Sequence, residues 1–199
     1  MDSKSLVIVG NGMVGHHLVT TIQEQGLDLS VTVIGEEPHL AYDRVHLSEL
    51  FAGNDAESLQ LSGADKYEEW GVTTVRGEAV TTIDRDLKTV VLSDGRVVAY
   101  DKLVLATGSY PFVPPIQGHE DPRCLVYRTI DDLDAIRRAS EGATRGVVVG
   151  GGLLGLECAN ALKNLGLKTH VVEFAPGLMG VQLDETGSAV LKSKVEDLD

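Results

Sequence analysis

The first 37 residues alternate between short apolar runs and one amphipathic segment. Leu6–Val9 is an apolar run of strand length, far too short to span a membrane. A helical pattern follows over Met13–Gln25, and Gly26 is placed to end it. A second β-branched run, Val31–Ile34, then stops at Gly35. The pattern predicts a strand, a helix and a second strand, which together form a βαβ unit.

Three glycines lie between the first strand and the helix in the spacing G-x-G-x-x-G, and an acidic pair follows the second strand. Glycine permits the tight turn, the approach of a pyrophosphate to the backbone and close packing of the helix, while a carboxylate accepts hydrogen bonds from a ribose. A glycine-rich turn in an ordinary α/β protein is the alternative, but the order of all four parts favours a dinucleotide site. The predicted site residues are Gly10, Asn11, Gly12, Met13, Val14, Gly15, Glu36 and Glu37.

The segment Pro38–Gly53 has neither a clean strand pattern nor a long helical one. Directly after a nucleotide-binding unit, such a segment can wrap the cofactor, with Arg44 donating hydrogen bonds to a phosphate or a ribose. A surface loop followed by a short helix is the alternative interpretation.

The middle of the chain predicts short strands. After the end of a short polar helix at Asp65–Gly71, we expect an antiparallel meander inserted behind the βαβ unit. A further apolar strand, Asp101–Ala106, runs into Thr107 and Gly108, which we expect to close the sheet edge beside the cofactor. The expected meander strands are Val72–Val75, Glu78–Ile83, Thr89–Leu92 and Val97–Ala99, with a hairpin turn at 93–96.

Tyr110–Gly118 carries three of the six prolines, so it cannot be a helix interior and is predicted to be a domain crossover. The next segment, Thr129–Ala139, predicts a helix with Thr129 as its N-cap. From Gly146 the opening pattern returns as strand, G-x-G-x-x-G, helix, strand and terminal acid, 140 residues after the first copy. This internal repeat predicts a second dinucleotide site.

The acid of the second site, Glu173, bears on the choice of coenzyme. A carboxylate accepts from the 2′-hydroxyl of NADH and repels the 2′-phosphate of NADPH, and the next four residues contain no Arg or Lys. We therefore expect NADH. Glu157 either faces the nicotinamide or caps the helix, and the sequence leaves both open. The residues predicted for this site are Gly150, Gly152, Leu154, Gly155, Glu157 and Glu173.

Composition narrows the function classes. The net charge of −13 argues against nucleic acid or an anionic membrane as a partner. The two cysteines, Cys124 and Cys158, lie far apart and form no metal-binding motif, so we expect no metal site in this chain and interpret Cys158 as a buried thiol. The first residues carry no signal-peptide pattern, so the expected location is the cytoplasm.

The quoted motifs resemble the N-terminal part of the large subunit of assimilatory NAD(P)H-dependent nitrite reductases, in the superfamily of pyridine nucleotide–disulfide reductase-like proteins. The resemblance runs along essentially the whole chain. Its most particular stretches are YDRVHLSELF and ATGSYPFVPP, because the superfamily shares the glycine fingerprints. Disulfide reductases carry a Cys pair soon after the first acid, where this chain has AYDRVHLSELF. Electrons are therefore expected to leave without a dithiol.

The resemblance implies an α/β protein with two Rossmann-like units, an inserted antiparallel meander and a truncated C-terminal unit. Residues 1–120 would begin an FAD-binding domain and residues 121–199 an incomplete NAD(P)H-binding domain. Electrons would pass from NADH through FAD to an iron-sulfur cluster and sirohaem in a downstream region or a small subunit. No catalytic side chain is expected, and the 199 residues alone should not reduce nitrite. The alternatives are an NADH-dependent ferredoxin or rubredoxin reductase and a non-catalytic nucleotide-binding fragment.

Overall fold

The computed structural model describes residues 3–198, which form two compact units. The first unit comprises Met1–Arg44 and Ala56–Tyr110, and the second comprises Val45–Asp55 and Pro111–Asp199. The predicted crossover at Tyr110–Gly118 thus contains the junction between the units. The division into an FAD domain over 1–120 and an NAD(P)H domain over 121–199 stays a prediction.

The first unit is built on a parallel four-stranded sheet in the order β3-β2-β1-β7. One face packs on helices α1 and α2, with Ile8 and Val33 of the sheet against Val19 of α1. The strand and helix predictions of the βαβ unit are confirmed to within a few residues at each end. The elements are β1 (Lys4–Val9), α1 (Met13–Glu24), β2 (Leu29–Gly35), α2 (Ala64–Glu69), β3 (Thr73–Arg76) and β7 (Lys102–Leu105).

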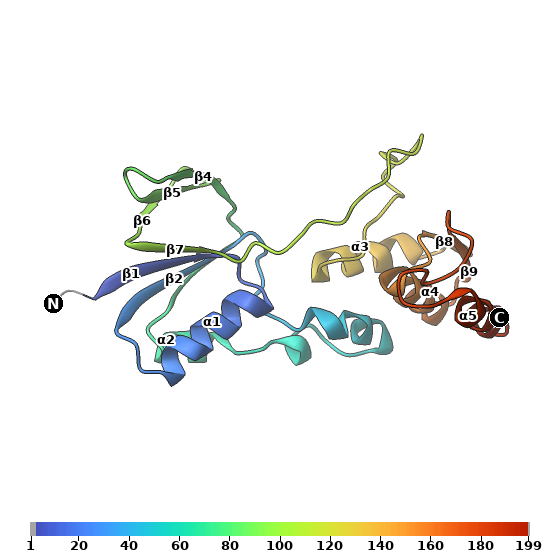
Figure 1. Cartoon of the computed structure of the whole chain (residues 1–199), viewed down its shortest axis with the longest axis horizontal. Helices are drawn as coiled ribbons and strands as arrows, with labels where there is room; N and C mark the ends of the chain where they lie inside the picture. The colour runs from blue at the N-terminus through green and yellow to red at the C-terminus, as the bar shows by residue number, and fades with distance from the viewer. Residues whose placement is uncertain (1–2, 199) are drawn as a thin grey trace. The chain divides into compact units, whose positions relative to one another are not determined.

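The other face of this sheet packs on a three-stranded antiparallel sheet, β4 (Val80–Asp84), β5 (Thr89–Leu92) and β6 (Val97–Ala99). Figure 1 shows this small sheet on one side of the parallel strands, with α1 and α2 on the other side. Val7 and Ile34 of the parallel sheet form an apolar cluster with residues of β5. The helices and the antiparallel sheet therefore bury opposite faces of the same parallel strands.

The meander has three strands rather than the predicted four. The segment expected as its first strand, Val72–Val75, lies instead at β3, which pairs in parallel with β2 as the edge strand of the main sheet. That prediction was wrong because a four-residue strand carries no local signal of its partner. Between β2 and β3 the chain forms two 3-10 segments, η1 (Arg44–Ala52) and η2 (Glu57–Leu59).

The second unit contains a two-stranded parallel sheet, β8 (Arg145–Val149) and β9 (Lys168–Val172), joined by helix α4 (Leu153–Asn164). Within the same unit, helix α3 (Ile130–Ser140) precedes this strand–helix–strand motif along the chain and α5 (Glu185–Glu196) follows it. Val148, Ile136 and Leu162 form its apolar cluster. The predicted repeat of strand, helix and strand is thus confirmed.

The face of β8 and β9 that points away from α4 is open. Val147, Val149 and Val172 are 60%, 62% and 54% exposed, respectively. In the first unit, Val7, Val9 and Ile34 take the corresponding places and are buried against the antiparallel sheet. Both faces of the parallel sheet are therefore covered in the first unit, whereas in the second unit only the face toward α4 is covered.

Helix α3 starts as the sequence predicts. The Thr129 side chain accepts from the backbone N–H of Asp132, and the Asp132 carboxylate accepts from the N–H of Thr129, which makes a capping box. Two acids lie in the first turn of α3 and two arginines in its last, where each complements the helix dipole.

Replacing Thr129 with Ala is expected to destabilise the protein by about 1 kcal/mol, because the N–H of Asp132 loses its acceptor. Urea denaturation of the purified protein measures the change. Thr129→Ser keeps the hydroxyl and should restore most of the loss. Equal stability of the Ala and Ser variants would show that the hydroxyl does not cap α3.

Candidate functional site: two glycine loops

The first glycine loop joins β1 to α1, and two of its glycines are sterically required. Gly10 has φ +114°, and a Cβ on it would lie 2.1 Å from the carbonyl oxygen of Ala106. A Cβ on Gly15 would lie 2.1 Å from the carbonyl oxygen of Gly10. These glycines thus permit the end of β7 and the first turns of α1 to approach the loop closely.

Gly12 differs, because no atom lies within 4 Å of the place its Cβ would occupy. It is the N-cap of α1 with ordinary extended dihedrals, so the backbone does not require glycine there. Its missing side chain leaves an open cradle in front of the helix N-terminus. Met13 and Val14, the first residues of α1, are 38% and 71% exposed beside this cradle.

The N-terminus of α1 carries no side-chain cap and no acid in its first turn. Helices α3 and α5, in contrast, are each capped by a side chain and have an acid in the first turn. No side chain of α1 therefore caps its first N–H groups or balances the positive end of its dipole. This arrangement suits an anionic group such as a pyrophosphate.

Asn11 fills the space under the loop. Its Oδ1 lies 3.4 Å from the hydroxyl of Tyr67, and its Nδ2 is buried without a hydrogen-bond partner. A Cβ on Gly35, the last residue of β2, would lie only 2.8 Å from the Cβ of Asn11. A buried donor without a partner next to the cradle fits a site that receives a polar ligand.

The two acids after β2 have different surroundings. Glu37 accepts from the hydroxyl of Tyr42 at 2.6 Å and forms an ion pair with Arg44. The guanidinium of Arg44 also lies 4.7 Å from the centre of the Tyr42 ring. Glu37 and Arg44 thus hold the segment after β2 together, whereas the exposed Glu36 has its bond with the hydroxyl of Tyr110, at 2.6 Å. Of the pair, Glu36 is better placed to accept from a ribose.

Thr107 and Gly108 follow β7 at the same end of the sheet as the glycine loop. Gly108 has φ +71°, which lets the chain turn there. Thr107 lines an open hollow of about 320 Å³ with Val9, Val80 and Leu105. Sequence reasoning missed Val80, because its position beside the end of β1 depends on how the two sheets pack.

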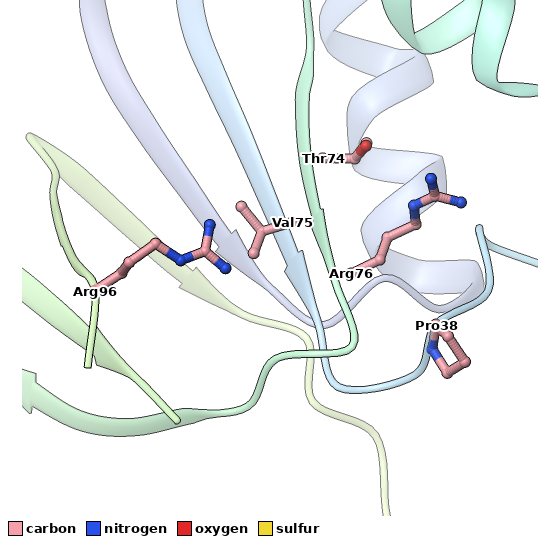
Figure 2. Close-up of a pocket in the computed structure, with 5 residues that line it drawn as sticks. All are labelled: Pro38, Thr74, Val75, Arg76 and Arg96. Carbon is pink, nitrogen blue, oxygen red and sulfur yellow. The ribbon is translucent and has the colours of Figure 1, made fainter. Parts of the chain in front are cut away.

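A second hollow, of about 460 Å³, lies at the edge strand β3. Figure 2 shows Arg76 and Arg96 on either side of Val75, with Pro38 nearby. Arg96 is ion-paired with Asp94. Sequence reasoning missed this pair of arginines, since Arg76 ends β3 and Arg96 lies in the turn between β5 and β6, and only the fold brings them to one hollow.

The second glycine loop, between β8 and α4, repeats the construction of the first. Gly150 has φ +123°, and a Cβ on Gly155 would lie 2.0 Å from the carbonyl oxygen of Gly150. Gly152 again has no atom within 4 Å of its Cβ position, and α4 has neither a side-chain cap nor an acid in its first turn. Leu154 is 54% exposed in that first turn. Both loops therefore present an open cradle at a helix N-terminus.

Glu173 closes the second loop. Its carboxylate accepts from the backbone N–H of Gly151 at 2.5 Å and from that of Ala175 at 2.7 Å. These backbone hydrogen bonds, that of Ala175 first, hold the pKa of Glu173 below its usual range. The carboxylate is thus fixed in place and ionised, and its role as a ribose acceptor stays a prediction.

The two predicted ribose acids are not equivalent in register. The N–H of Gly10 donates to Ile34, and that of Gly150 donates to Val172, each at 2.8 Å. Counted from these bonds, Glu173 corresponds to Gly35, one residue before Glu36. The first loop has a side chain on Asn11 where the second has Gly151, so each repeat places one side chain between loop and strand end.

Two side chains on α4 were predicted with open roles. Because α4 has no side-chain cap, the alternative in which Glu157 caps the helix is wrong, and its approach to the nicotinamide stays a prediction. Cys158 is half-buried rather than fully buried as predicted, and its partial burial raises the pKa of its thiol. Within residues 3–198, no group of three or more His, Cys, Asp or Glu side chains could hold a metal ion, and no helix is long and apolar enough to cross a membrane.

The fold and the two loops define an α/β protein with two Rossmann-like units and an antiparallel sheet in the first. The chain belongs to the pyridine nucleotide-disulphide oxidoreductase family, whose model matches residues 4–199.

Among proteins of known name, the chain is 54% identical over its full length to the NAD(P)H nitrite reductase large subunit of Klebsiella oxytoca. It is 50% identical over its full length to the NADH nitrite reductase large subunit of Escherichia coli. The chain spans 21% and 24% of those relatives, respectively. Among solved structures, NADH:rubredoxin oxidoreductase from Clostridium acetobutylicum matches 99% of this chain and 51% of its own, with a TM-score of 0.88 and 26% identity.

Proposed function

We propose that this chain is the nucleotide-binding reductase part of an NADH-dependent nitrite reductase. It would hold FAD, receive electrons from NADH, and pass these electrons to an iron-sulfur and sirohaem centre located elsewhere. Nitrite would be reduced to ammonia at that centre. The identity of 50–54% along the whole chain to large subunits of that enzyme supports this proposal. The observation that carries it is the pair of open cradles at Gly12 and Gly152, since one chain with two such cradles suits two dinucleotides.

In the first unit the open side of Gly12 and the first turn of α1 would bind the pyrophosphate of FAD. Glu36 would accept from the adenosine ribose, and Thr107 and Gly108 would border the cofactor. The ion pair between Glu37 and Arg44 holds the segment after β2. Arg44 would therefore donate to a phosphate or a ribose only with guanidinium N–H groups that this ion pair does not use.

In the second unit Gly152 and the first turn of α4, with Leu154, would bind the pyrophosphate of the nicotinamide nucleotide. Glu173 would accept from the 2′-hydroxyl of its ribose. A fixed carboxylate repels a 2′-phosphate, and residues 174–177 offer no cation to neutralise that phosphate. NADH is thus the coenzyme that this site suits best.

The chemistry that FAD would supply when bound is acceptance of a hydride and release of electrons singly or in pairs, so the chain itself would need no nucleophile or acid–base pair. What its residues contribute is binding and orientation at two places. The glycine loops accept the pyrophosphates without steric conflict, and two carboxylates fix the riboses. Because no thiol pair follows Glu37, electrons would leave without a dithiol.

The natural polypeptide that carries this chain tests the proposal. Purified, it should be yellow, with the visible absorption bands of bound flavin, and NADH should bleach those bands under anaerobic conditions. Nitrite should then restore the colour with formation of ammonia. A colourless protein that takes up no added FAD would contradict the flavin assignment and favour a bare nucleotide-binding protein.

Replacing Glu173 with Ala should weaken NADH use and narrow the preference for NADH over NADPH. Loss of the charged acceptor of a ribose hydroxyl costs about 1.5–3 kcal/mol of binding free energy. This loss corresponds to a decrease of about 10- to 100-fold in kcat/KM for NADH. Steady-state kinetics with both coenzymes measures the effect. Glu196→Ala, an exposed acid on α5 of the same unit, serves as the control, and unchanged kinetics of Glu173→Ala would show that Glu173 does not contact the ribose.

The likeness to NADH:rubredoxin oxidoreductase favours one alternative, in which a small electron carrier accepts the electrons. Both functions use the same two nucleotide sites and differ in the acceptor. Oxidation of the NADH-reduced protein by rubredoxin or ferredoxin, with no reaction toward nitrite, would favour this alternative.

A further inference from the structure

One hydrogen bond crosses the first glycine loop. The hydroxyl of Tyr110 donates to Oε2 of Glu36 at 2.6 Å, although the two residues lie 74 positions apart. Glu36 follows β2 and Tyr110 comes after β7, and the sheet order places β1 between these strands. Since the glycine loop continues from the end of β1, the bond spans the edge of the sheet where that loop lies.

The path of the chain after β7 agrees with this placement. The N–H of Ala106 donates to the carbonyl of Val9, and the carbonyl of Ala106 faces the Cα of Gly10 so closely that a Cβ there has no room. Gly108 then turns the chain with φ +71°. In Figure 1 the segment leaves β7 at the edge where β1 and β2 end. Tyr110 therefore reaches Glu36 from the far side of the loop.

Little besides the hydroxyl holds Tyr110 in this position. Its side chain is 80% exposed, so its ring has almost no packing to lose. Tyr42, which bonds the neighbouring acid Glu37, is only 2% exposed and is part of the core. The carboxylate hydrogen bond raises the pKa of Tyr110, so the phenol keeps its proton and remains a donor at neutral pH. The Tyr110–Glu36 contact can thus open at low cost, unlike the Tyr42–Glu37 contact.

We propose that Tyr110 is a latch on the first nucleotide site, whose hydroxyl competes with the ribose hydroxyls of the incoming dinucleotide for the Glu36 carboxylate. This inference rests on the proposed function, in which Glu36 binds the adenosine ribose of FAD. Tyr110 must leave Glu36 before the ribose takes its place. Only molecules in which Tyr110 has left Glu36 can bind the ribose. The apparent affinity for the nucleotide is therefore the intrinsic affinity multiplied by the fraction of molecules in which Glu36 is not bonded to Tyr110.

The size of the effect follows from one exposed hydrogen bond. Removing the hydroxyl removes the net free energy that one such hydrogen bond typically contributes. The affinity for the nucleotide should therefore rise about three- to tenfold. The gain should appear for FAD and also for ADP-ribose, because both carry the adenosine ribose that Glu36 would bind. It should vanish when the side chain at position 36 has no hydrogen-bond acceptor.

The test uses the purified flavoprotein freed of its FAD, with binding of FAD and of ADP-ribose measured by calorimetry. Tyr110→Phe should bind both about three- to tenfold more tightly. Tyr100→Phe is the matched control, since its hydroxyl donates to the carbonyl of Asp84 at 3.3 Å, and its affinities should equal those of the parent protein. In a Glu36→Ala background, which has no acceptor at position 36, Tyr110→Phe should have no further effect.

Weaker binding by Tyr110→Phe would overturn the latch, as would unchanged binding by that variant, and as would an equal gain in the Glu36→Ala background. The first result would mean that Tyr110 supports the bound nucleotide rather than competing with it. Parent protein that binds both ligands while Tyr110→Phe shows no gain would contradict the latch alone. Parent protein that binds neither ligand would contradict the latch together with the proposed function.

Discussion

The Gly15→Ala variant is expected to be about 2–3 kcal/mol less stable than the parent protein. Alanine is the better helix former by about 1 kcal/mol, so propensity alone predicts the opposite sign. The added Cβ, however, would lie 2.1 Å from the carbonyl oxygen of Gly10, a backbone atom that cannot rotate away. The steric cost outweighs the propensity gain, and α1 must shift away from the loop.

Gly12→Ala is the matched control in the same loop. Its Cβ meets no atom within 4 Å and its dihedrals are ordinary, so its stability should stay within about 1 kcal/mol of the parent. Urea denaturation followed by tryptophan fluorescence measures both variants. Trp70 is the only tryptophan and packs against the apolar cluster of the first unit, so its signal reports that unit. A Gly15→Ala protein as stable as Gly12→Ala would contradict the packing described here.

The features that could be predicted from sequence are local ones. Both glycine loops lie between a strand and a helix as expected, because the spacing of Gly10, Gly12 and Gly15 sets the turn within a few residues. The cap at Thr129 is also local, since the side chain bonds a backbone group three residues on. The internal repeat then carried the same reasoning to the second unit.

The features that sequence reasoning missed depend on contacts between distant residues. The strand β3 was assigned to the wrong sheet because pairing with β2 is not encoded in its four residues. Glu36 and Glu173 were treated as equivalent, since each is an acid after a second strand. Their one-residue offset emerges only from the backbone bonds of Gly10 and Gly150.

The sequence likewise predicts only some of the contacts that the charged side chains near the first loop make. Arg44 was expected to donate to a phosphate or a ribose, and the structure pairs it with Glu37 seven residues before it. The contact of Tyr110 with Glu36 bridges strands that are not neighbours, and no sequence pattern indicates it. Such pairs arise where several strands end at one edge of a sheet.

We propose that the two cradles hold different dinucleotides, FAD at Gly12 and NADH at Gly152. No heavy atom lies within 4 Å of the Cβ position at either glycine, so a valine side chain would begin in the open cradle. The two substitutions should therefore have large and different effects on function. Trp70 fluorescence in urea serves as the check that Gly12→Val remains folded.

The most direct measurement is the visible spectrum of Gly12→Val and Gly152→Val proteins before and after anaerobic addition of NADH. Gly12→Val is expected to be purified without flavin. Gly152→Val is expected to retain FAD with normal absorption, while NADH reduces it at least about 100-fold more slowly at a fixed low concentration, which corresponds to about 2.7 kcal/mol of lost binding. A Gly12→Val protein that keeps its flavin, or a Gly152→Val protein that loses flavin, would contradict the assignment of the two sites.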